Sequence, residues 1–206
     1  GDSLSREDMI SGSMNYWLEH NNEVVAWNHE SDECEEIIQA NSAVWWDEVR
    51  PDMKPIAVEE RFEIPLVTDT DGPEIWLQGT IDLVQEYPLP IVDWKNPGRK
   101  PHAEWEKKRW SVQAAAYTYA VNELYGFDKP LDFEFVYLVK GKVHRTTVNF
   151  GPAQWESLVA LARSAGTLIN ANLPVWPLNM TGWHCSPKWC GAWKNCRGKH
   201  AGPNPF

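Results

Sequence analysis

The sequence predicts an α/β (α+β) fold, in which helices pack on a central mixed β-sheet. The main observation is the order of hydrophobic patterns along the chain: two helical segments, three strands, a helix, two strands and a last helix. The second is composition, since 206 residues with 43% hydrophobic and 23% charged side chains suit one soluble globular domain. The chain contains neither an internal repeat nor a low-complexity linker.

Two helices are expected before the first strand. Ser5 with Asp8 three residues later forms a capping arrangement, so the first helix should run from there to about His20. The second is expected over 32–48, with Ser31 as its cap. Two prolines shortly after this segment end it.

The first strand, "IAVEERFEI" at 56–64, alternates between an apolar and a polar face. Glu60 is the one acid on the apolar face, whereas its neighbour Glu59 falls on the polar face. A carboxylate on a buried face needs a partner or a metal ion, so the alternation singles out Glu60. The apolar face comprises Ile56, Val58, Glu60, Phe62 and Ile64.

Two further strands complete an antiparallel meander: "EIWLQGTIDLV" at 74–84 and "IVDWK" at 91–95. Residues two apart in a strand share a face, so Asp93 and Lys95 should point the same way. An isolated pair of this kind is usually a solvated face. Here, however, three neighbouring strands each offer an acid, namely Glu60, Asp82 and Asp93.

Clustered carboxylates repel one another unless a cation lies among them, and hard oxygen ligands suit Mg²⁺ or Mn²⁺. A lysine beside such an ion can position or deprotonate a water molecule. The alternative interpretation is a surface ladder of cross-strand charges. The alternation around Glu60 and the shared face of Asp93 and Lys95 favour the metal site.

A helix is expected over 104–125, in an Ala-rich stretch that allows close packing on the sheet. It carries Gln113 and Tyr117 four residues apart, and therefore on one face. Beyond it, "LDFEFVYLV" and "VHRTTVNF" should pair as a hairpin across "KGK". The last helix should follow Pro152 and run to about Asn172.

The net charge of −10 conceals an uneven distribution. Residues 1–60 carry 15 acids and 3 bases, whereas basic side chains gather at 95–110 and 183–200. An acidic N-terminal part followed by two basic segments is compatible with binding a polyanion at one surface. The candidate DNA-binding residues are Arg99, Lys100, Lys107, Lys108 and Arg109.

The strings "GTID", "VDWK" and "QAAAY", in that order, resemble the motifs G-x-x-D, (D/E)-x-K and Q-x-x-x-Y of the PD-(D/E)xK nuclease superfamily, specifically its RecB-type branch. The resemblance covers residues 56–117 directly and includes an upstream glutamate in "VEERF". Small members occur among phage exonucleases and CRISPR-associated RecB-like exonucleases, and the chain looks most like those. The resemblance implies a restriction-endonuclease-like core.

By this resemblance, Asp82 and Asp93 would ligate Mg²⁺ or Mn²⁺ together with the backbone carbonyl of Trp94. Lys95 would act on the attacking water, and Glu60 would support the metal or its water.

The helix after the meander would contribute Gln113 and Tyr117, which would contact the scissile strand or orient the lysine. One departure concerns the metal-binding histidine that many relatives carry in an early helix. In this chain Asn15 or Tyr16 stands where it would fall.

Three of the four cysteines lie within 12 residues near the C-terminal end, which suggests a metal site in a cytoplasmic protein. With His200 they have the ligand types and spacing of a zinc site. In the RecB-like exonucleases, one earlier cysteine joins three late ones around a [4Fe-4S] cluster, and Cys34 would take that part here. We favour the cluster, whose ligands would be Cys34, Cys185, Cys190 and Cys196.

We therefore expect one nuclease domain over 1–206, made of a helical part at 1–50, a core at 56–172 and a cysteine cluster at 183–200. The expected activity is metal-dependent DNA exonuclease activity on single strands or duplex ends, in the cytoplasm of a prokaryotic or phage-infected cell. The alternative is a non-catalytic nucleic-acid-binding module with a structural zinc site. No apolar run approaches the length of a membrane span.

Overall fold

The computed structural model divides into two compact units, Gly1–Arg163 and Ser164–Phe206. The first unit contains the sheet and the helices that pack on it. The residues described are 4–20, 31–68, 74–86, 91–102, 104, 107–108, 111–127, 129–171 and 193.

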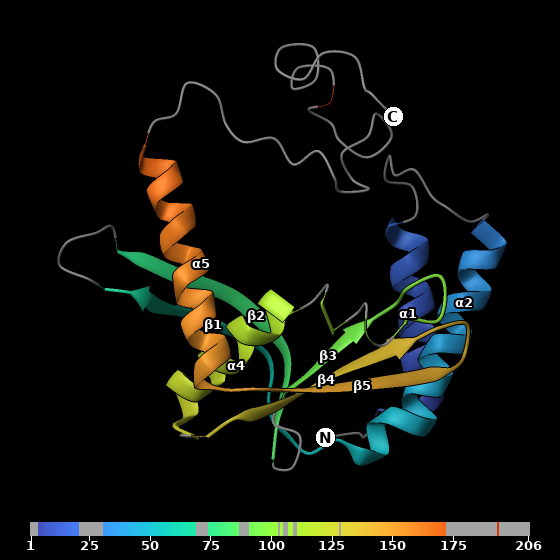
Figure 1. The fold of residues 1–206 in the computed structure, drawn as a ribbon. Helices are drawn as coiled ribbons and strands as arrows, with labels where there is room; N and C mark the ends of the chain where they lie inside the picture. The colour runs from blue at the N-terminus through green and yellow to red at the C-terminus, as the bar shows by residue number, and fades with distance from the viewer. Residues whose placement is uncertain are drawn as a thin grey trace. The chain divides into compact units, whose positions relative to one another are not determined.

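The first unit is built on a five-stranded mixed sheet in the order β1-β2-β3-β4-β5 (Figure 1). β1, β2 and β3 form an antiparallel meander, β3 and β4 run parallel, and β4 and β5 form an antiparallel hairpin. The mixed sheet, the meander and the hairpin confirm the expectations from the sequence. The strands are β1 Pro55–Val67, β2 Ile75–Gln85, β3 Ile91–Lys95, β4 Leu131–Leu138 and β5 Val143–Phe150.

Because parallel neighbours cannot be joined by a tight turn, the chain crosses between β3 and β4 through the helix α4 (Ser111–Tyr125). The alanines of α4 are buried on two sides. Ala114 and Ala120 pack on the sheet, whereas Ala115 and Ala116 pack toward α5 and the end of β1. Small side chains on both sides let α4 lie close to the sheet and to its neighbouring helix.

The last helix, α5 (Pro152–Asn170), begins at the predicted proline. Its first half packs on α4 through Leu158. Trp155 Nε1 donates a hydrogen bond of 3.0 Å to Thr118 Oγ1, a buried hydroxyl in the middle of α4. This hydrogen bond fixes the start of α5 against the crossover helix.

The opposite face of the sheet is covered by α2 (Ser31–Val44) and two short turns that follow it, η1 (Trp45–Val49) and η2 (Arg50–Asp52). Val44 and Val49 pack there against residues of β2, β3 and β4. Before them, α1 (Arg6–His20) starts with the predicted capping hydrogen bonds, since Asp8 N–H donates to Ser5 Oγ and Ser5 N–H donates to Asp8.

Asn41 links α2 to the far end of the sheet. Its side chain is buried, donates to the Leu138 carbonyl at 3.2 Å and accepts from the Gly141 N–H at 2.8 Å. Gly141 has a φ of +75° in the tight β4–β5 turn, and a Cβ there would lie 3.2 Å from Ala40 Cβ. The predicted "KGK" turn therefore needs its glycine, both for the backbone and for the approach of α2.

The predicted alternation of β1 holds from Glu60 onward but is wrong before it. Phe62, Ile64 and Leu66 are buried as expected. Val58, however, is exposed, and Ala57 packs toward the cluster beneath α4 instead. The cause is Glu59, whose φ of +52° places it in the left-handed region and shifts the alternation by one residue.

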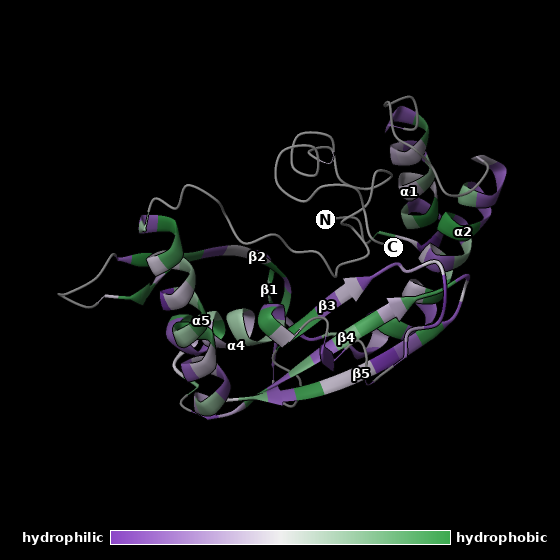
Figure 2. Cartoon of the chain, turned by 45° about the horizontal axis from the view of Figure 1, so that its top comes forward, coloured by the Kyte–Doolittle hydropathy of each residue, from purple (hydrophilic) through white to green (hydrophobic). Residues whose placement is uncertain are grey.

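The hydrophobic residues lie along the middle of the sheet. β4 is hydrophobic over most of its length and β3 only in its first part, whereas β5 at the edge mixes hydrophobic and hydrophilic residues (Figure 2). Among the described residues, no helix is long and apolar enough to cross a membrane.

One buried acid on β4 holds the turns of η1 and η2 to the sheet through an arginine. Glu134 is 5% exposed and accepts a hydrogen bond of 3.0 Å from Arg145 Nη1. Arg145 Nη2 also donates to the Glu48 carbonyl at 3.2 Å and lies 3.5 Å from an Asp52 oxygen. Burial raises the pKa of Glu134, and the arginine offsets only part of that rise.

Replacing Arg145 with methionine should destabilise the fold by about 2–3 kcal/mol at neutral pH, less than for a fully buried ion pair because the arginine is partly exposed. The change removes the counter-charge of Glu134, which raises the pKa of that carboxyl further. The destabilisation should therefore be small below the usual carboxyl pKa, where the acid is protonated, and should grow as the pH rises. Urea denaturation across a pH series measures it.

The control is the double variant Glu134→Gln with Arg145→Met, in which no buried charge remains. It should recover much of the missing stability at neutral pH. An Arg145→Met variant that is destabilised equally at acid and neutral pH would show instead that the hydrogen bond to Glu48 matters most.

Candidate active site

The candidate site lies where β2 and β3 separate. Their backbone pairing consists of Leu83 with Val92 and Val84 with Ile91, and it stops there. Two residues beyond Val92 on β3, Trp94 N–H donates a hydrogen bond of 2.9 Å to Asp82 Oδ2. The carboxylate of β2 thus takes the place of a backbone carbonyl, and it holds the two strands at their point of separation.

On its other side, β3 stays paired with β4 to its last residue, with Asp93 opposite Phe135 and Lys95 opposite Tyr137. The end of β3 is therefore held by β4, although it has no ladder bonds to β2. As predicted, the acid and the base share a face: Lys95 Nζ lies 2.7 Å from Asp93 Oδ2.

The crossover helix fixes the orientation of this acid. Gln113 Nε2 donates a hydrogen bond of 3.0 Å to Asp93 Oδ1. The other oxygen, Oδ2, has its ion pair with Lys95 but no well-aligned hydrogen bond in the described part of the chain. The side chain of Asp93 is 2% exposed, against 21% for Lys95. The acid is thus enclosed while the lysine reaches toward solvent.

Burial raises the pKa of Asp93, and the negative charge of Asp82 raises it further. Lys95 and Gln113 lower it but do not reverse the rise. A buried carboxylate next to a second one is the arrangement that a bound cation stabilises.

The donors present fit Mg²⁺ or Mn²⁺. Mg²⁺ keeps several water ligands and is commonly held by one or two carboxylates, and Asp82 with Asp93 supplies two. Within the described ranges, no group of three Asp, Glu, His or Cys side chains could share one ion. The remaining ligands would then be water, substrate or backbone oxygen.

Tyr117 lies one turn of α4 beyond Gln113 and packs edge-on against Phe62, with ring centroids 5.8 Å apart. Burial raises the pKa of its hydroxyl, and the charges of Asp93, Asp82 and Glu59 add to the rise. The hydroxyl therefore remains a neutral hydrogen-bond donor at physiological pH.

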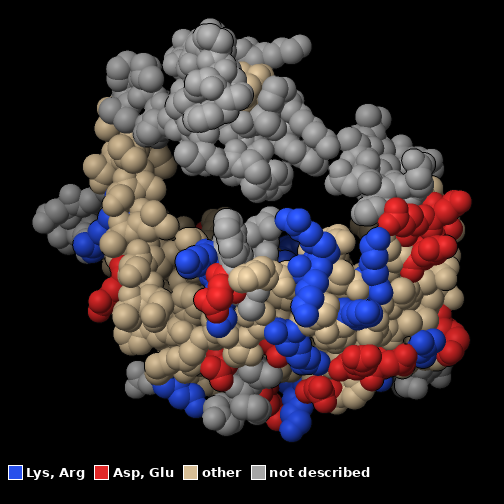
Figure 3. Space-filling view, turned by 45° about the vertical axis from the view of Figure 1, so that its right-hand side comes forward, with Lys and Arg blue, Asp and Glu red and all other residues tan. Residues whose placement is uncertain are grey.

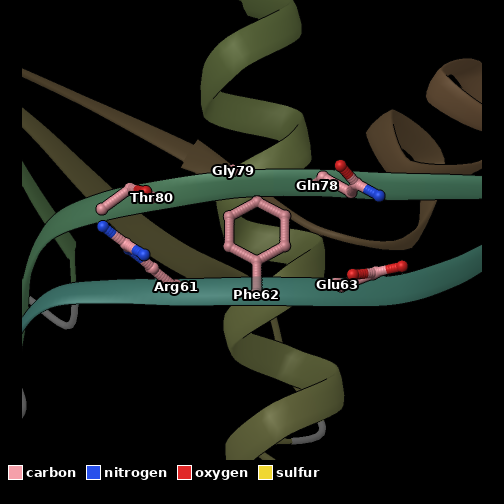
Figure 4. Close-up of a pocket in the computed structure, with 6 residues that line it drawn as sticks. All are labelled: Arg61, Phe62, Glu63, Gln78, Gly79 and Thr80. Carbon is pink, nitrogen blue, oxygen red and sulfur yellow. The ribbon is translucent and has the colours of Figure 1, made fainter.

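Gly79, the glycine of "GTID", makes room for this packing. Phe62 pairs with it across the strands, and a Cβ on Gly79 would lie 2.7 Å from Phe62 Cζ. Figure 4 shows the ring reaching toward Gly79. Phe62 and Gly79 line an open hollow of about 480 Å³, and the acids of the candidate site are not among its lining residues. The hollow is lined by Arg61, Phe62, Glu63, Gln78, Gly79 and Thr80.

The two glutamates of β1 differ in their surroundings. Glu60, which the sequence singled out, pairs with Ile81 and is half-buried, and its charge acts on Tyr125 near the end of α4. Glu59 acts on Tyr117 instead. The alternation in the sequence could not distinguish the two glutamates in this way. It assumes a regular strand, and a glutamate in the sequence does not signal a left-handed backbone.

Of the candidate DNA-binding residues, Arg99 and Lys100 are exposed just after β3, and Lys107 lies 3.5 Å from Glu104. Lys108 is exposed, and Arg109 lies outside the described residues. Figure 3 shows Lys and Arg side chains across the middle of one face, with acids between some of them and further acids along its margins.

The cysteine prediction falls mainly outside the described residues, where Cys185, Cys190, Cys196 and His200 lie. Cys34 is half-buried on α2, and burial with the charges of its acidic neighbours raises the pKa of its thiol. Asn15 and Tyr16, at the position of the absent histidine, are exposed on α1.

The fold has a solved counterpart in a protein from Eubacterium rectale described as a "putative exonuclease". The two are 13% identical with a TM-score of 0.53, and the match covers 100% of this chain and 79% of the other. The crystal structure of SSO0001 is also 13% identical, with a TM-score of 0.44, over 93% of this chain and 85% of that one. No curated protein sequence matches.

At 13% identity, the likeness to the Eubacterium rectale protein shows the fold alone. The sequence itself matches the PD-(D/E)XK nuclease superfamily over residues 13–197, which is most of its length and includes Asp82, Asp93 and Lys95. The chain belongs to the PD-(D/E)XK nuclease superfamily.

Proposed function

We propose that the protein is a metal-dependent DNA exonuclease that hydrolyses phosphodiester bonds of single strands or at duplex ends. The observation that carries the proposal is the grouping of Asp82, Asp93 and Lys95 where β2 and β3 separate. A protein that only binds nucleic acid needs no such group, whereas metal-dependent hydrolysis of a phosphodiester uses a bound cation and an activated water. The likeness to the Eubacterium rectale protein is compatible with it.

In the proposed site, Asp82 and Asp93 would hold Mg²⁺ or Mn²⁺, with the backbone carbonyl of Trp94. The bound cation lowers the pKa of a coordinated water and offsets negative charge at the phosphate. Gln113 keeps the Asp93 carboxylate from turning, because it holds Oδ1 and leaves Oδ2 toward Lys95. Lys95 Nζ would orient the attacking water by a hydrogen bond.

Tyr117 would donate a hydrogen bond to the phosphate, since its raised pKa keeps the proton on the hydroxyl. Arg99 and Lys100 would bind the backbone of the incoming strand, because they are exposed within five residues of Lys95. Lys107, Lys108 and Arg109 would extend this basic segment toward α4.

For the cysteines we propose a structural [4Fe-4S] cluster held by Cys34, Cys185, Cys190 and Cys196. The rival is zinc held by the last three with His200. Either metal would be structural, because four protein ligands leave no position open for substrate.

Lys95→Met should lower the rate of cleavage about 100-fold or more, because it removes the group that orients the water while keeping the packing of the side chain. DNA affinity should change little. The assay follows end-labelled single strands with Mg²⁺ or Mn²⁺, and a closed circular single strand should resist an exonuclease. The matched control is Lys142→Met at an exposed lysine of the β4–β5 turn. Cleavage by Lys95→Met at the wild-type rate would refute the proposed site.

Replacing both Arg99 and Lys100 with glutamine should weaken binding to single-stranded DNA and flatten its salt dependence. For each phosphate that the protein no longer neutralises, the slope of log affinity against log salt concentration should become shallower by about 0.7. The control is Lys54→Gln, at an exposed lysine just before β1. The first residue of β1, Pro55, pairs with Gln85 at the end of β2. An unchanged slope in the double variant would place the DNA path elsewhere.

Cys34→Ser distinguishes the two metals. With the cluster, protein purified without air should be brown, and the variant should lose iron and melt at a lower temperature. With zinc, the protein should be colourless, and His200→Ala should be the damaging change. The iron and zinc contents of Cys34→Ser, His200→Ala and the wild type decide between the cluster and zinc.

A further inference from the structure

Within β1, Glu59 has a left-handed backbone. Its φ of +52° is a conformation that glycine adopts readily and that side chains such as glutamate rarely adopt. Such departures persist where the surrounding structure enforces them, and they are found preferentially at functional sites.

β2 is also irregular, at the residues that lie opposite Glu59. Val58 pairs with Leu83, and Glu60 pairs with Ile81, so Glu59 and Asp82 lie between the same two pairs. On β2, Ile81 and Val84 both pack in the cluster beneath α4, whereas Leu83 packs on the opposite face. Strict alternation would not allow residues three apart to share a face, so β2 also shifts by one residue here.

The face of Asp82 follows from its neighbours. Counting back from Val84, Asp82 falls on the face that carries α4, which is also the face of its partner Asp93. Glu59 stands opposite Asp82 in the register of the two strands, and its side chain is exposed there. The two irregularities therefore meet at Glu59 and Asp82, beside the candidate site.

The electrostatic surroundings agree with this geometry. The charge of Glu59 acts on Tyr117, as do the charges of Asp82 and Asp93, whereas the charge of Glu60 acts on Tyr125. Tyr117 and Tyr125 are eight residues apart, about 12 Å along the helix.

We propose that Glu59, rather than Glu60, is the upstream carboxylate of the active site. It is a positioning residue, which adds a third negative charge beside Asp82 and so strengthens the binding of the divalent cation. This assignment rests on the proposed function. Because no three acidic groups of the described chain could share one ion, Glu59 acts through the field at Asp82 and not as a third ligand. Affinity for hard cations rises with the negative charge of the site.

The test compares Glu59→Gln with Glu60→Gln, two equal changes at neighbouring residues. Mn²⁺ binding to the protein without DNA is measured by calorimetry and by the metal-induced rise in melting temperature. Glu59→Gln should weaken binding about 10-fold or more, as loss of an outer partner of a metal ligand does. Glu60→Gln should bind within about twofold of wild type.

A third variant, Glu59→Gly, separates this role from a purely structural one. Glycine relieves the left-handed backbone, so the metal-free variant should melt at the wild-type temperature or above it. It should nevertheless bind Mn²⁺ as weakly as Glu59→Gln. A glycine variant with wild-type metal affinity would overturn the assignment.

The outcomes also separate this assignment from the proposed function. If wild type binds Mn²⁺ and cleaves DNA while Glu59→Gln binds as tightly, or if Glu60→Gln alone loses affinity, the role of Glu59 is refuted and the nuclease remains. If wild type binds no Mn²⁺ and cleaves no DNA, the proposed function fails and this assignment fails with it.

Discussion

The separation of β2 from β3 is the constraint on which the rest of the structure depends. After Val92 the strand loses its backbone partner on one side, and the Asp82 carboxylate receives the Trp94 N–H in its place. An unpaired N–H at this position would be costly in a buried sheet. A side chain that satisfies it must stand in the gap between the strands, and so an acid is held beside the buried Asp93.

The other side of β3 makes that gap a fixed site. The parallel pairing with β4 continues to Lys95, and parallel pairing requires the crossover through α4. The crossover helix then lies on the face of Asp93 and supplies Gln113 to it. The topology that connects the strands therefore also delivers the residue that orients the acid.

Close packing in the centre explains why small residues stand where they do. Alanines on two sides of α4 let it fit between the sheet and the start of α5, and Gly79 leaves space for the Phe62 ring beside Tyr117. These positions do no chemistry themselves. They set the distance between the helix that carries Gln113 and Tyr117 and the strands that carry the acids.

The sequence by itself determined the order and type of the elements, because hydrophobic period and capping residues are local signals. It also placed Asp93 and Lys95 on one face, since residues two apart in a regular strand always share one. The tertiary structure alone decided which glutamate of β1 lies near enough to Tyr117 for its charge to raise the pKa of that hydroxyl. The left-handed backbone of Glu59 puts the alternation before it one residue out of step with the alternation after it, and β2 makes the same shift at the opposite positions. A shift that two strands share leaves no signal in the hydrophobic period of either strand alone.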